Sequence, residues 1–256
     1  MKNSKEALEV VYNNALDLIL NKKLKEGEKL LEKIHSSGNV NIDILNLLGI
    51  IKYMYCGFYG AKKYWNESLK ISYEDNKAYE FIGDIESDDF KLISEKYKDS
   101  ISLIEDKNYL QAIENLEEIN KRRSELIEVK ILLALLYMTI DEKNKAFKNI
   151  ESALSYDTSN YKIKEIYDEM KCDLVKGKDK EKDESEELAF SQSILNLIMI
   201  LNYRINSFYE EELKYRNEEI KSLYEEIKTM NLEIESLNTE KEKLSLEINL
   251  AVLNIF

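Results

Sequence analysis

The chain has 256 residues, a formal net charge of −13, no proline and only seven glycines. Because proline breaks helix interiors and glycine weakens them, this composition favours a protein built from long helices. The negative charge argues against a nucleic-acid-binding protein, which needs a basic face to displace counterions.

Two cysteines, Cys56 and Cys172, form neither a disulfide framework nor a metal-ligand pattern, and we expect both to be packing residues in helical surroundings. The first residues lead into an amphipathic pattern without the apolar block of a signal peptide. The longest apolar run, residues 194–201, is shorter than the roughly 20 residues of a membrane span. We therefore expect a cytoplasmic protein with no membrane span.

Residues 1–175 show helical periodicity that short polar breaks interrupt. The breaks lie at residues 36–39, 74–76 and 157–160, and they carry Ser, Asn, Asp and Thr side chains that cap helices and bond to turn backbone. No segment keeps the two-residue alternation of a strand, so the sequence predicts an all-α protein.

A spacing of 34 residues recurs in this region. A three-residue signature occurs four times. It consists of a small residue, a large apolar residue four positions on, and a small or apolar residue three positions further. Small residues also lie twelve positions before each signature, where they allow the two helices of a pair to approach closely. The signatures are Gly27/Leu31/Ile34, Ala61/Trp65/Ser68, Ala112/Leu116/Ile119 and Ala146/Ile150/Ala153, preceded by Ala15, Gly49, Ser100 and Ala134.

This pattern resembles the tetratricopeptide repeat (TPR) family over roughly residues 7–158. The best local match is Leu45, Leu48-Gly49, Ala61 and Trp65, and the second is Leu133-Ala134, Tyr137, Ala146 and Ala153. The resemblance implies a TPR-like solenoid of antiparallel helix pairs in residues 1–175. The family's tryptophan position holds Leu45 in one repeat and Lys130 in another, and its closing proline is absent.

The repeat loses its phase in the middle of the chain. Gly83 lies 34 residues after Gly49, but Glu95 and Asp99 stand where a small and a large apolar residue are expected. The sequence therefore predicts one irregular helix around residues 76–87, between two regular halves. Residues 158–175 are predicted to form a closing helix, since the terminal units of stacked repeats are atypical.

The pattern changes after residue 175. Residues 176–187 are charged and without apolar side chains, which is typical of a linker. Residues 188–208 are apolar on nearly all sides, so we expect this helix to be buried against the repeat stack or against its copy in a dimer.

From residue 213 onward the sequence follows a heptad pattern. Ile predominates at one seam position and Leu at the other, which favours a parallel two-stranded coiled coil. Lys241 interrupts the seam. The alternative is a single amphipathic helix that lies on its own repeat domain. The predicted dimer seam comprises Leu213, Ile220, Leu223, Ile227, Met230, Ile234, Leu237, Leu244 and Ile248.

The two flanks of this seam differ in charge. One flank carries Glu219, Glu226, Glu233, Glu240 and Glu247, and the other carries Tyr224, Asn231, Asn238 and Ser245. A parallel homodimer would set Glu against neutral residues. Either such a homodimer relies on its core alone, or the glutamates meet a basic stripe on another protein.

The chain carries few of the residues that catalysis needs. Its single histidine, His35, is expected at the C-terminal end of a helix, where the helix dipole favours it. With no glycine-rich phosphate loop, nucleophile motif or His/Cys metal pattern, we expect no enzyme activity, no cofactor and no metal.

The TPR resemblance implies a groove lined by the first helix of each pair. At matching positions these residues are largely apolar, which suits the apolar face of a partner helix or peptide. The alternative is that they pack inside the stack or against residues 188–208. The implied groove residues are Tyr12, Leu16, Ile19, Asn46, Ile50, Tyr53, Ile131, Leu135 and Met138.

The sequence thus predicts a non-enzymatic adaptor that dimerises through the coiled coil and binds a protein or peptide in the groove. Two alternatives remain, a peptide-responsive regulatory protein and a chaperone cofactor or assembly factor.

Overall fold

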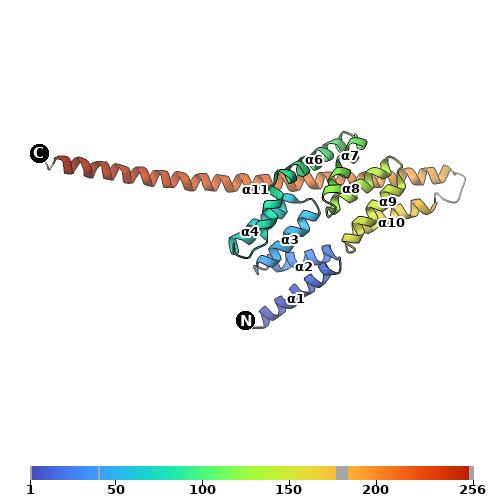
Figure 1. The fold of residues 1–256 in the computed structure, drawn as a ribbon, viewed down its shortest axis with the longest axis horizontal. Coiled ribbons are helices and arrows are strands. Elements are labelled where there is room, and N and C mark those ends of the chain that lie inside the picture. Colours follow the sequence, from blue (N-terminus) through green and yellow to red (C-terminus); the bar gives the residue numbers. More distant parts are fainter. Residues whose placement is uncertain (1, 40, 177–183, 254–256) are drawn as a thin grey trace. The chain divides into compact units, whose positions relative to one another are not determined.

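The structure is a computed structural model that describes residues 2–39, 41–176 and 184–253. Within these ranges every regular element is an α-helix, so the predicted all-α fold class is confirmed (Figure 1). The helices are α1 (Lys2–Leu20), α2 (Leu24–Ser36), α3 (Ile42–Met54), α4 (Phe58–Ile71), α5 (Ala78–Glu86), α6 (Asp88–Glu105), α7 (Tyr109–Arg122), α8 (Ile127–Thr139), α9 (Lys143–Tyr156), α10 (Tyr161–Lys176) and α11 (Glu184–Leu253).

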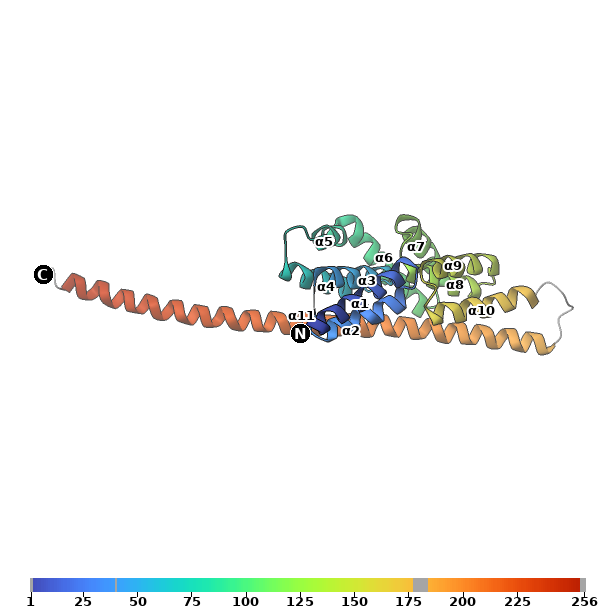
Figure 2. The same cartoon turned by 90° about the horizontal axis from the view of Figure 1, so that it is seen from below.

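Successive helices pack as antiparallel pairs, as in a TPR-like solenoid. The pairs are α1–α2, α3–α4, α6–α7 and α8–α9, and α10 packs on α9 (Figures 1 and 2). The short α5 lies where the sequence predicts an irregular helix, between two pairs on either side. The predicted closing helix is α10.

The same turn joins the two helices of all four pairs. Lys22, Cys56, Lys107 and Asp141 each adopt a left-handed conformation with φ of 58–61°. The next residue in each turn donates its N–H to the carbonyl five residues earlier, as in a Schellman motif. Cys56 is therefore a turn residue, although its burial agrees with the expected packing role.

Small residues let the paired helices approach closely, as the repeat signature predicts. A Cβ built on Gly49 would lie 2.2 Å from Nε1 of Trp65, and one on Gly27 would lie 2.6 Å from Cγ1 of Ile19. Real side chains do not approach this closely, so a larger residue at either position would force its neighbour to shift.

The loop before α10 closes the stack onto its first pair. This clasp, residues 157–160, supplies hydrogen-bond partners to the N-terminus of α2, whose N-cap residue Lys23 makes no side-chain capping bond. The backbone N–H of Lys25 donates to Oδ2 of Asp157 at 3.1 Å. The N–H of Glu26 donates to Oγ of Ser159 at 3.2 Å. The first and last parts of the repeat region are thereby joined.

The chain divides into two compact units, Met1–Phe208 and Tyr209–Phe256. The division falls inside α11, which has 70 residues. Of the predicted linker, residues 177–183 lie outside the described part of the chain, and α11 already begins at Glu184.

Candidate protein-interaction surfaces

The predicted groove residues all belong to first helices, α1, α3 and α8, but they differ in burial. Five are half-buried: Tyr12, Leu16, Ile19, Asn46 and Ile50. The other four are buried in the core: Tyr53, Ile131, Leu135 and Met138. All three predicted groove residues on α8 are therefore closed to solvent, as is Tyr53 on α3.

Two of these groove residues make polar contacts inside the stack. Asn46 donates through Nδ2 to Oδ1 of the buried Asn76 at 2.9 Å, which ties α3 to the loop before α5. The hydroxyl of Tyr53 donates to Oε1 of Glu125 at 2.9 Å. Burial and this carboxylate raise the pKa of Tyr53 well above its usual range. Both side chains therefore link elements of the stack.

Helix α8 is buried along almost its whole length, including two charged residues. Lys130, at the family's tryptophan position, donates through Nζ to Oδ1 of Asn120 at 2.6 Å. Glu128 forms an ion pair with Arg204 of α11, with Oε2 and Nη1 3.1 Å apart and the side chains 11% and 13% exposed. A buried carboxylate needs such a partner.

Several described side chains of α11 between residues 199 and 206 pack against the stack. Ile205 is 2% exposed and joins the main core cluster, and Ile200 packs against that cluster. Nζ of Lys162, on α10, lies 4.2 Å from the ring centroid of Tyr203. This segment is thus buried by its own stack at these positions, one of the two alternatives that its apolar sequence left open.

The predicted dimer seam is exposed in the single chain. Its eight described side chains, Leu213 through Leu244, are 50–63% exposed. The side chain of Ile248 lies outside the described residues. Glu219, Glu226, Glu233 and Glu240, on one flank, are exposed as well. This is an apolar stripe along one face of a helix.

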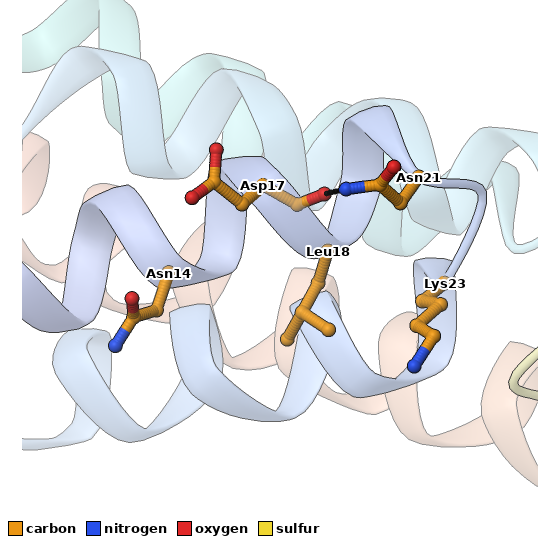
Figure 3. Close-up of a pocket in the computed structure, with 5 residues that line it drawn as sticks. All are labelled: Asn14, Asp17, Leu18, Asn21 and Lys23. Carbon is orange, nitrogen blue, oxygen red and sulfur yellow. Dashed lines mark hydrogen bonds between the residues drawn. The ribbon is translucent and has the colours of Figure 1, made fainter.

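A surface pocket of ≈ 560 Å³ lies beside the α1–α2 turn (Figure 3). Asn14, Asp17, Leu18, Asn21 and Lys23 line it, and Nδ2 of Asn21 donates to the backbone oxygen of Asp17 at 2.7 Å. The lining residues carry no nucleophile activated by a base, so the pocket offers no evident chemistry.

No group of three or more His, Cys, Asp or Glu side chains in the described part of the chain is arranged to hold a metal ion. No helix there is long and apolar enough to cross a membrane.

The sequence reasoning missed the Glu128–Arg204 pair and the clasp. A lone arginine within the apolar residues 188–208 and a lone glutamate beside an apolar helix are signals that could have suggested the pair. The clasp has no such signal, because its partners on α2 are backbone N–H groups, which every residue but proline carries.

No protein-family model and no curated protein matches the chain. Two solved structures are similar. MamA AMB-1 has a TM-score of 0.30 and 11% identity, with 80% of this chain and 93% of that chain covered. The MamA RS-1 ArsTM double mutant has a TM-score of 0.31 and 16% identity, with 78% and 97% covered. Scores this low do not bear on function.

Proposed function

We propose that the chain is a non-enzymatic protein-interaction scaffold. Two copies pair in parallel through the seam on α11, and each repeat stack offers the first-helix face to a partner helix or peptide. The observation that carries the proposal is the stripe of eight apolar seam side chains. Each of them is at least half exposed to solvent in the single chain.

The apolar area of this stripe supports pairing between two copies. Burying a Leu, Ile or Met side chain fully stabilises by about 1.5–3 kcal/mol. Because the seam residues start about half-exposed, each gains roughly half as much, and sixteen side chains contribute in a dimer. The summed gain, about 12–24 kcal/mol, lies mostly above the roughly 4–15 kcal/mol that association costs.

The residue types favour a parallel pair of helices. Ile220, Ile227 and Ile234 occupy one seam position, and Leu223 and Leu237 occupy the other, the arrangement typical of parallel dimers. In an antiparallel pair the glutamate flanks of the two copies would face each other. Repulsion between these like charges would destabilise the antiparallel dimer. The parallel arrangement avoids this repulsion.

A matched pair of substitutions tests the seam. Ile227→Glu places a charge in the seam, and Leu232→Glu places the same charge on the far side of the helix, where the native leucine is 61% exposed. We expect the molar mass from light scattering to fall from dimer to monomer for the first variant only. Equal masses for both variants and the unchanged chain would refute the seam.

A further inference from the structure

The first unit contains a helix segment that lies on the predicted partner face of its own stack. On α8, Glu128 precedes Ile131, Leu135 and Met138 by three, seven and ten residues, so all four share one helix face. Arg204 of α11 pairs with Glu128 on that face. The neighbouring Ile205 is buried in the same core cluster as the three apolar residues.

We infer that residues 199–206 of α11 are a built-in ligand of the repeat stack, which a partner helix must displace from α8. This inference rests on the first-helix face of the proposed function. It places a segment of the same chain beside α8, where the three predicted groove residues are buried, whereas Tyr12, Leu16, Ile19, Asn46 and Ile50 remain half-buried.

The contacts of this segment suit a ligand that can be exchanged. Met199 and Tyr203 are 68% and 58% exposed, so only part of the segment is held. The Glu128–Arg204 pair contributes little net stability, since desolvation of two charges offsets their attraction. Loss of the Arg204 cation from beside the buried Glu128 is costly, however, so a displacing helix with a cation of its own is favoured.

The segment also defines the chemistry of a partner. A displacing helix would present an arginine or lysine to Glu128 and a branched aliphatic residue beside it, as Arg204 and Ile205 do. Apolar residues one turn away would contact the face of Leu135 and Met138. An amphipathic helix with a basic edge has this character.

A peptide-binding experiment on the full chain tests the inference. The probe is a fluorescent synthetic peptide with the sequence of residues 196–210. In the unchanged chain the segment already occupies the stack. The apparent affinity for the peptide is therefore the intrinsic affinity multiplied by the fraction of molecules in which the segment is released. We expect Arg204→Glu to release the segment, because it sets two carboxylates against each other, and to tighten peptide binding at least tenfold.

Two further variants control for charge and folding. Lys214→Glu makes a similar charge change elsewhere on α11 and should leave peptide binding as in the unchanged chain. Arg204→Gln tests the same release without repulsion, and circular dichroism at 222 nm verifies that each variant is folded. If folded Arg204→Glu and Arg204→Gln bind the peptide no more tightly than Lys214→Glu, the inference is wrong.

The molar mass of the same samples separates this inference from the proposed dimer. Tighter peptide binding by monomers would support the built-in ligand and reject the seam. Dimers with unchanged peptide binding would reject the built-in ligand and leave the seam intact.

Discussion

The carboxylate of Asp157 accepts a hydrogen bond from the backbone N–H of Lys25, 3.1 Å away, although the two residues are 132 positions apart. The same oxygen accepts a bond from the hydroxyl of Tyr55 at 2.6 Å. A carboxylate at a helix N-terminus also interacts favourably with the helix dipole. Asp157 thus joins the loop before α10 to the first two helix pairs.

Replacing Asp157 should weaken the whole repeat region. Asp157→Ala removes the acceptor of two part-buried donors, the Lys25 N–H and the Tyr55 hydroxyl, which we expect to cost about 2–3 kcal/mol in the free energy of unfolding. The matched control is Asp168→Ala on the exposed side of α10, which should change little. Chemical denaturation measures both, and equal losses would show that the clasp adds no stability.

Two glycines in similar helical settings should respond in opposite ways to alanine. Gly49→Ala places a methyl group against Trp65, and we expect a loss of about 1–3 kcal/mol or more from overpacking. A Cβ on Gly83 meets nothing within 4 Å, so Gly83→Ala should stabilise by about 1 kcal/mol through helix propensity. Thermal unfolding of the two variants checks the signs, and a stabilised Gly49→Ala would contradict the close approach of α3 and α4.

The repeated left-handed turns predict a stabilising change. Lys107 has a φ of 58°, a conformation that glycine adopts without steric cost, so Lys107→Gly should stabilise by up to about 1 kcal/mol. Lys148→Gly, in the interior of α9, should instead destabilise by about 1 kcal/mol. Urea titration compares the two, and a loss of stability in both would argue against the turn geometry.

The buried Glu28 should make stability depend on pH. Burial acts to raise its pKa, but the ammonium groups of Lys25 and Lys52 outweigh burial, and the net pKa is lowered. A lowered folded-state pKa gives stability that is present above the unfolded value, about 4.3, and is lost as pH falls through the folded one. We expect Glu28→Gln to be less stable than the unchanged chain at pH 7. We also expect its free energy of unfolding to fall less steeply as the pH is lowered.

The control for this pH dependence is Glu151→Gln on the exposed face of α9. Its unfolding free energy should fall with acid as steeply as that of the unchanged chain. If Glu28→Gln keeps the full slope between pH 5 and pH 3, the ion pairs around Glu28 are not its cause.

The helix pairs could be predicted from the sequence because their signals are local and periodic. Small residues at positions such as Gly49 and Ala61 recur at fixed spacing, and the lost phase at Glu95 indicated α5. The Glu128–Arg204 ion pair could not be predicted in the same way. It joins α8 to α11, and contacts between residues so far apart leave no periodic trace.

The clasp is a second feature that the sequence did not reveal as a contact. Residues 157–160 were correctly expected to form a polar break, but the acceptor they supply to the N–H of Lys25 lies across the fold. Any loop with Asp and Ser could cap its own helix, so composition alone does not identify a distant partner.

Sedimentation equilibrium of the full chain at micromolar concentration decides whether the proposed scaffold pairs through α11. The chain mass is 30.1 kDa. We expect a species of twice this mass, and a mass of 30.1 kDa across the concentration range would refute the pairing.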